Sequence, residues 1–107
     1  MTPEELRLQV ARARRETMRW LLLVTMNVAR PAPASVGMLL TVLRGEYPDA
    51  TDLEIRRELD YLESRELISL HTDPLGHTTA KMERYGIDVH DYTVECDPGI
   101  ARPKAGS

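Results

Sequence analysis

The chain has 107 residues and a mass of 12.1 kDa, which is the size of one small domain. Apolar residues make up 42% and charged residues 29%, so the composition excludes both a disordered chain and a membrane protein. The longest apolar stretch, residues 20–28, is far shorter than the roughly 20 residues that span a bilayer, and we expect it to be a buried helical segment. The single cysteine, Cys96, excludes an intrachain disulfide and fits a reducing compartment, so we expect a cytoplasmic protein.

Charge is distributed unevenly along the chain. The formal net charge is −3, but residues 1–30 contain six arginines and three glutamates, whereas residues 31–107 contain 8 basic and 14 acidic residues. The first segment is therefore basic and the remainder acidic. This asymmetry restricts where a nucleic acid could bind.

A proline followed by two glutamates at residues 3–5 is typical of a first helical turn. Apolar residues then recur at helical spacing, which predicts a long helix over residues 3–29 that ends at Pro31 and Pro33. The residues that share one face of this helix are Leu6, Val10, Ala13, Trp20, Leu21, Val24 and Val28.

Two shorter helices follow. Ser35 is a suitable N-cap for a helix that runs to Gly45. Residues 51–54, Thr-Asp-Leu-Glu, have the form of a capping box and predict the start of a third helix. Its apolar face is formed by Ile55, Leu59 and Leu62.

After Glu66 the apolar period changes from helical to alternating, which predicts two strands over residues 68–73 and 77–82. The turn is Asp-Pro-Leu-Gly at residues 73–76; if its centre is at residues 74–75, His71 lies opposite Thr78. Residues 83–92 are interpreted as a last helix. We expect residues 97–107 to be an extended or flexible tail, either docked or mobile.

The predicted fold is mainly α with a small β-hairpin. Residues 59–68, LDYLESRELI, resemble the junction between the recognition helix and the wing in the winged helix-turn-helix superfamily, which implies a winged-helix domain over residues 1–96. Residues 80–88, 91–96 and 98–103 resemble small winged-helix proteins of Mu-like bacteriophages and prophages. This resemblance implies a winged-helix fold and a phage or prophage origin, hence a bacterial host cytoplasm, whereas a role in transcription regulation follows from analogy with the fold alone.

Winged helices usually place the third helix in the major groove of DNA and the hairpin along the backbone. The residues that the resemblance places at DNA are Arg56, Arg57, His77, Thr78 and Thr79. The third helix and its exit hold six acidic residues and three arginines, which repel phosphate. The alternative interpretation is that Arg56 forms an ion pair with Asp60 one turn later in the helix and that Arg57 pairs with its acidic neighbours.

The N-terminal helix offers a second set of contacts. Arg12 and Arg15 could follow a phosphate backbone, or they could be solvated, or they could pair with the acidic body of a second subunit. Six residues follow the spacing of a coiled-coil seam, which predicts a possible homodimer through this helix. They are Leu6, Val10, Ala13, Thr17, Trp20 and Val24.

No metal site, cofactor site or catalytic motif is expected. His71 and His77 do not face one another across the hairpin in the predicted register, and His90 and Cys96 do not share a helix face. We therefore predict that the protein is not an enzyme. From the winged-helix resemblance we predict that it binds duplex DNA. The alternative is a winged-helix protein-protein adaptor or phage assembly factor that does not bind DNA.

Overall fold

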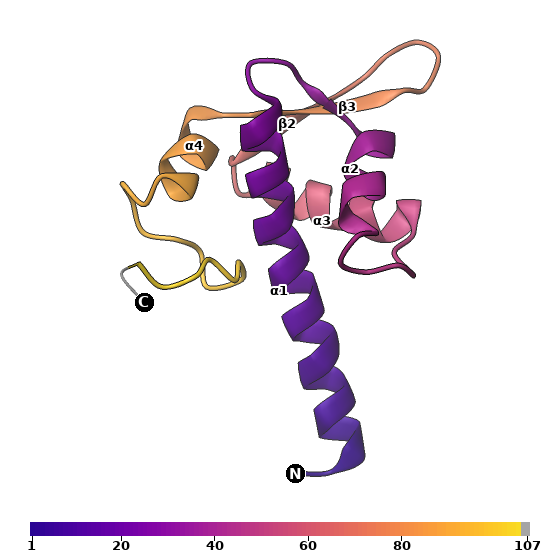
Figure 1. Cartoon of the computed structure of the whole chain (residues 1–107), viewed down its shortest axis with the longest axis vertical. Helices are drawn as coiled ribbons and strands as arrows, with labels where there is room; N and C mark the ends of the chain where they lie inside the picture. The colour runs from indigo at the N-terminus through magenta and orange to yellow at the C-terminus, as the bar shows by residue number, and fades with distance from the viewer. Residues whose placement is uncertain (106–107) are drawn as a thin grey trace.

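Residues 1–105, which are the residues that the computed structural model describes, form four helices and a three-stranded antiparallel sheet (Figure 1). The elements in chain order are α1 (Pro3–Ala29), β1 (Ala34–Ser35), α2 (Val36–Leu43), α3 (Asp52–Ser64), β2 (Ile68–Thr72), β3 (Thr78–Met82) and α4 (Arg84–His90). The prediction of a mainly α fold with a small amount of β structure is confirmed. None of the helices in residues 1–105 has the length and apolar character needed to cross a membrane.

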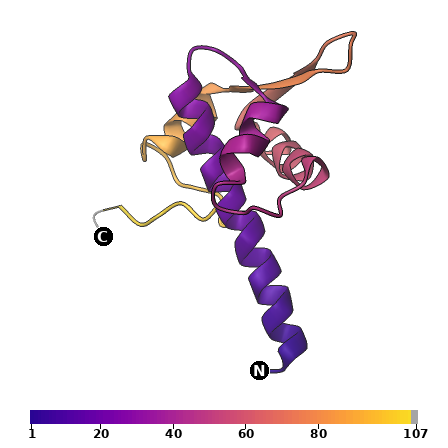
Figure 2. The ribbon, with the colours of Figure 1, turned by 45° about the vertical axis from the view of Figure 1, so that its right-hand side comes forward.

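The first helix has the predicted bounds. Its N-cap is Thr2, whose hydroxyl accepts a hydrogen bond from the backbone N–H of Glu5 at 3.1 Å. Figures 1 and 2 show that the N-terminal half of α1 projects beyond the rest of the molecule. Every residue from 1 to 13 is exposed, so only the second half of α1 packs in the core.

The buried face of α1 differs from the predicted one. Its buried residues are Met18, Leu22, Leu23 and Met26. Val28, which we expected to be buried, is 80% exposed. The expectation was wrong because residues 20–28 are apolar almost all around the helix, so periodicity cannot say which side meets the core.

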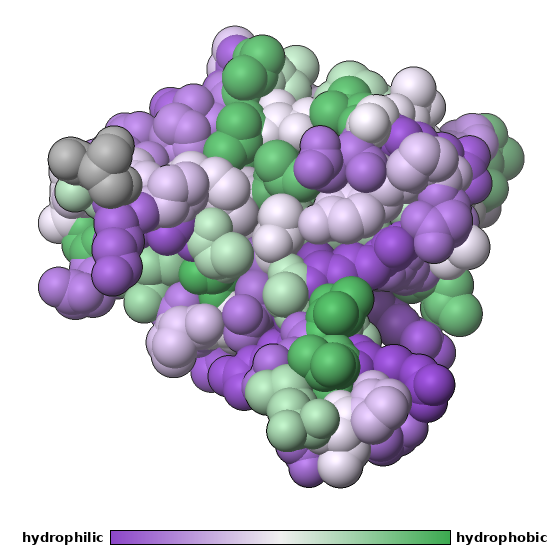
Figure 3. Space-filling view, turned by 60° about the horizontal axis from the view of Figure 1, so that its bottom comes forward, coloured by the Kyte–Doolittle hydropathy of each residue, from purple (hydrophilic) through white to green (hydrophobic). Residues whose placement is uncertain are grey.

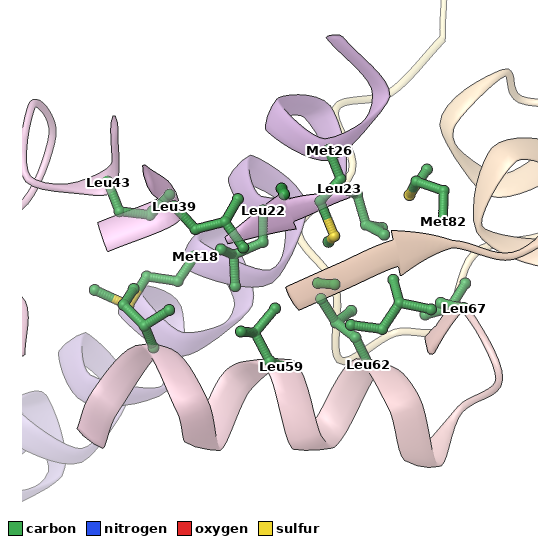
Figure 4. Packing of buried hydrophobic residues seen from close by; sticks show 14 of the residues in the cluster. Met18, Leu22, Leu23, Met26, Leu39, Leu43, Leu59, Leu62, Leu67 and Met82 are labelled. Atoms are coloured by element: carbon green, nitrogen blue, oxygen red, sulfur yellow. The ribbon is translucent and has the colours of Figure 1, made fainter. Parts of the chain in front are cut away.

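The second and third helices begin at the predicted caps. The Ser35 hydroxyl accepts from Met38 N at 3.1 Å, and the Thr51 hydroxyl accepts from Glu54 N at 3.2 Å. The predicted apolar face of α3, Ile55, Leu59 and Leu62, is fully buried, because α3 packs against α1 and α2. Figure 4 shows Leu59 and Leu62 pointing from α3 toward the buried residues of α1. This packing leaves the opposite face of α3 in solvent.

The end of α3 is formed by a residue with positive φ. Glu66 has φ 65°, its N–H donates to Glu63 O, and the N–H of buried Leu67 donates to Leu62 O. These two bonds form a Schellman motif, in which glycine is the usual residue at this position. A glutamate here stores backbone strain.

The sheet has the strand order β1-β3-β2, and β1 was not predicted. It is only two residues long, Ala34–Ser35, and pairs with Thr79 and Ala80, which is too short for a sequence period. The hairpin register also differs from the prediction, because His71 lies opposite Thr79. The loop has three residues and ends at Gly76, φ 84°, so the register shifts by one residue.

The last helix is shorter than predicted, at Arg84–His90. A Cβ at Gly86 would lie 2.1 Å from the carbonyl oxygen of Leu67, so glycine is required for this close approach. The following segment is docked: Ile100 is buried, and Ala101 N donates to Glu16 O of α1 at 3.0 Å. Residues 106–107 of the predicted tail lie outside the described residues.

Candidate nucleic-acid interface

The hairpin and α3 meet at Arg56. The Arg56 guanidinium donates to the Thr78 hydroxyl on β3 at 3.1 Å, and the Thr78 and Thr72 hydroxyls are 2.9 Å apart across the hairpin. A groove of about 360 Å³ runs between the two elements. Its lining is Val36, Arg56, Leu59, Asp60, Glu63, Leu70, Thr72 and Thr78. Two of the predicted DNA contacts, Arg56 and Thr78, are thus brought together.

Arg56 is also held by an ion pair within α3. Its Nε lies 2.5 Å from a carboxylate oxygen of Asp52, one helical turn earlier. The predicted pair with Asp60 was therefore wrong: the guanidinium reaches toward the N-terminus of the helix, where it meets both Asp52 and Thr78. Both partners orient the side chain beside the hairpin.

Arg57 lies on the other side of the exposed face of α3. Together with Arg15 of α1 it lines a groove of about 330 Å³ between the two helices. Both arginines are exposed, and neither forms an ion pair with another residue of the described chain. The exposed face of α3 therefore has a basic side chain on each flank, with Arg56 toward the hairpin and Arg57 toward α1.

Much of the acidic charge of α3 is compensated by α1. Arg14 binds Glu54 in a bidentate manner at 2.8 and 2.9 Å and reaches Asp49 at 3.0 Å. These bonds lower the pKa of Asp49 and raise the pKa of Arg14. Glu58, only 4% exposed, pairs with Arg19 at 2.8 Å. Two arginines of the basic first thirty residues thus pair with three acids of the body of the same chain.

A further acid of α3 has a structural role. The Glu63 carboxylate accepts from the backbone N–H of Leu70 at 2.8 Å. Strand β2 lies at the edge of the sheet, so this bond satisfies a donor that has no strand partner on that side. Glu63 is therefore engaged with the sheet edge.

The other predicted contacts are more dispersed. His77 is exposed directly after the hairpin loop, 3.3 Å from Asp73, and Thr79 is half-buried on β3. Arg12 forms an ion pair with Glu16 at 3.1 Å and does not line the groove that contains Arg15. The structure thus separates Arg12 from the other predicted residues.

Sequence reasoning missed the cluster that fixes the C-terminal segment. The Arg19 guanidinium stacks on the Tyr61 ring at 3.6 Å from its centroid, and the Tyr61 hydroxyl donates to Asp97 at 2.7 Å. The hydrogen bond lowers the pKa of Asp97, while burial raises the pKa of Tyr61. Arg19 also donates to Gly99 O at 2.8 Å. The unexplained excess of arginine in residues 1–30 was the only available signal.

Within residues 1–105 no group of three potential ligands is arranged to hold a metal ion. Cys96 is half-buried, and burial raises the pKa of its thiol, so the thiol is protonated at neutral pH. Its Sγ lies 3.5 Å from the carbonyl oxygen of Asp97. This environment is typical of a packed thiol.

Comparison with known proteins adds no relative. The chain matches no family model, no curated protein and no solved structure.

Proposed function

We propose that this chain is a winged-helix protein that binds duplex DNA, with α3 entering the major groove and the β2–β3 hairpin as the wing. The element order supports the fold assignment, because a short strand precedes α2 and the hairpin follows α3 directly. The observation on which the function depends is the placement of Arg56 and Arg57 on the two flanks of the exposed face of α3.

Charge along α3 is polarised in the direction that this interaction requires. Recognition helices contact bases mainly with their N-terminal residues. Residues 52–57 carry Asp52 and Glu54 against Arg56 and Arg57, a net charge of zero, whereas residues 58–66 carry four acids against Arg65, a net charge of −3. Phosphate repulsion is therefore weakest where the helix would approach DNA.

The ion pairs with α1 reduce the repulsion further. Glu54 and Glu58 are each paired with an arginine of α1, so they do not act as uncompensated charges. The count of six acids and three arginines in α3 and its exit omits Arg14 and Arg19, which lie against it. With these two arginines included, and also Asp49, which Arg14 binds as well, the local excess of negative charge falls from three to two.

The proposed contacts divide into two classes. Arg57 and Arg15 contact phosphate, because both are exposed and without an ion pair in the described chain. Arg56 contacts a base edge, since Thr78 and Asp52 hold its guanidinium in a defined position. His77 and Thr79 belong to the wing. A role as a phage or prophage regulator is part of this proposal.

Binding of a labelled duplex of mixed sequence tests the proposal by fluorescence anisotropy at several salt concentrations. We expect affinity to fall about tenfold or more between about 50 and about 200 mM salt, because phosphate contacts release counterions. Arg57→Ala should weaken binding and reduce the salt slope by about 1. Absence of binding at micromolar protein and low salt would overturn the proposal.

The matched control is Arg84→Ala. Arg84 is an exposed arginine that pairs with Asp88 on α4 and lines neither groove beside α3. Its removal changes the net charge by the same amount as Arg57→Ala, so it should leave the salt slope unchanged. An equal loss of DNA affinity in both variants would show that the duplex is attracted only by net charge, and it would contradict a specific contact at Arg57.

The second candidate is a protein-protein adaptor that uses the same surface. Leu53 on α3 and Leu75 at the hairpin tip are both large apolar residues exposed to solvent, which a DNA contact does not require. If the duplex does not bind, these residues identify the surface to test with protein partners. Leu75→Asp would then abolish partner binding while leaving the fold intact.

A further inference from the structure

One face of α1 is mostly apolar; it is exposed at its two ends and half-buried between them, where Trp20 stacks on His90 and packs edge-on against Tyr92. Its residues are Leu6, Val10, Ala13, Thr17, Trp20, Val24 and Val28. Leu6 is 50% exposed, Val10 is 68% exposed and Val28 is 80% exposed. The buried residues Met18, Leu22 and Met26 occupy the opposite side of the helix, so we call this stripe the outer face of α1.

The outer face has different surroundings at its two ends. At the C-terminal end it forms one wall of an apolar groove of about 340 Å³, the other wall being α2. The groove is lined by Val24, Thr25, Val28, Ala29, Met38 and Val42. At the N-terminal end the helix stands clear of the body, and hydrophobic side chains are visible at the surface of this region (Figure 3).

The projecting half of α1 lacks the packing that stabilises helices. Residues 3–13 are exposed on all sides, and isolated helices shorter than about 12–15 residues are marginal in water. Exposed Leu6 and Val10 gain free energy when another apolar surface covers them. The projecting half therefore presents exposed apolar side chains on a convex surface, and the groove between α1 and α2 is an exposed apolar concave surface. The two surfaces are complementary in shape and in polarity.

We propose that two copies of this chain associate through the outer faces of α1, antiparallel, so that the projecting half of each covers the apolar groove of the other. A two-fold axis at Thr17 places Leu6 opposite Val28 of the second copy and Val10 opposite Val24 of the second copy. The exposed apolar residues at the two ends of the stripe then meet one another. This interface is independent of the proposed DNA contacts.

Charge supports the antiparallel direction. In this register Glu4 and Glu5 lie beside Arg30 of the second copy, whose exposed guanidinium is bonded within its own chain to Asn27 at 3.1 Å. In an antiparallel pair the positive N-terminal end of each α1 dipole also lies beside the negative C-terminal end of the other, which is favourable. A parallel arrangement would place the glutamates against those of the second copy and leave the groove uncovered. Since α3 packs on the opposite face of α1, both copies keep α3 accessible.

Light scattering on the full chain tests association. We expect the wild-type protein to have twice the mass of one chain. The Val10→Asp and Val28→Asp variants should each have the mass of a single chain. Leu75→Asp is the matched control, because Leu75 is an exposed apolar residue at the hairpin tip, and it should leave the mass unchanged. Circular dichroism confirms that each variant is folded. A wild-type monomer at concentrations well above micromolar, or a dimer that both α1 variants leave intact, would overturn the proposal.

Cysteine cross-linking tests the direction in a Cys96→Ser background. Leu6→Cys chains mixed with Val28→Cys chains should form a disulfide between copies under mild oxidation, whereas Leu6→Cys chains alone should not. Efficient cross-linking of Leu6→Cys alone would establish a parallel pair and contradict the antiparallel register. Duplex binding by a monomeric Val10→Asp chain is measured separately, so failure of the dimer and failure of DNA binding are distinguishable.

Discussion

The two faces of α1 have similar residue types and different environments. The inner face places Met18, Leu22 and Met26 in the core, whereas the outer face leaves Leu6 and Val28 in solvent. Two arginines of α1 also differ in environment. Arg12 and Arg19 are two turns apart on the same side of the helix, but Arg19 is largely covered in its ion pair with α3, whereas Arg12 lies in the projecting half, is exposed and pairs only within α1. Residue type alone therefore does not reveal which side of a long helix builds the domain.

Truncation of one apolar side chain on each face should give the largest contrast. Leu22→Ala removes a fully buried side chain and should lower the free energy of unfolding by about 2–5 kcal/mol. Val10→Ala should change it by no more than about 0.5 kcal/mol in dilute solution. Urea denaturation measures both values. Comparable losses would mean that the projecting half of α1 packs against the body.

The ion pairs of the projecting half and of the packed half of α1 should differ nearly as much. Glu58→Gln removes the charge partner of Arg19 in a nearly dry site and should cost about 3 kcal/mol. Glu16→Gln removes the partner of the exposed Arg12 and should cost about 0.5 kcal/mol or less. Thermal or urea unfolding separates these outcomes. A large cost for Glu16→Gln would show that Arg12 is as constrained as Arg19.

Low pH should weaken the contact between Asp97 of the C-terminal segment and Tyr61 of α3. The bond from Tyr61 holds the pKa of Asp97 below its ordinary value of 3.8, so its stabilising contribution is present above that value and lost as the pH falls through the lower folded pKa. Asp97→Asn should remove this part of the acid dependence and cost about 1 kcal/mol at neutral pH. Urea denaturation from pH 7 to pH 3 measures it; an unchanged acid slope would contradict the assignment.

A stabilising substitution at the end of α3 should raise the free energy of unfolding of the domain without affecting association through the outer face of α1. Glu66→Gly relieves the positive φ at the end of α3 and should raise the free energy of unfolding by roughly 1 kcal/mol. The same variant should leave the mass in solution unchanged, because Glu66 lies away from the outer face of α1. Destabilisation by glycine would show that the glutamate side chain has a role beyond backbone geometry.

Local signals predicted the elements well. The caps at Ser35 and Thr51 and the apolar face of α3 are set by neighbouring residues, so they can be recognised in sequence. Strand β1 could not be predicted, because a two-residue strand exists only through its pairing with β3. The hairpin register depended on whether the loop has two or three residues, because a difference of one residue in the loop shifts every pair along the hairpin.

The candidate interface was predictable only in part. The sequence identified Arg56 and Arg57 as a pair but could not show that Arg56 meets the hairpin and that Arg57 faces α1. It also could not show that Arg14 and Arg19 compensate the acids of α3, since these residues are about forty positions apart in the chain. Charge counting within one helix therefore overestimated its repulsion of DNA.

Chemical-shift mapping with a DNA duplex tests the proposed function most directly. Addition of a mixed-sequence duplex at low salt to the isotopically labelled chain should shift the amide signals of residues 52–57 and 73–79 most strongly. Signals from α4 and the docked segment around Ile100 should change little. Shifts confined to the projecting half of α1, or no shifts at all, would contradict the assignment of α3 and the hairpin as the DNA-binding surface.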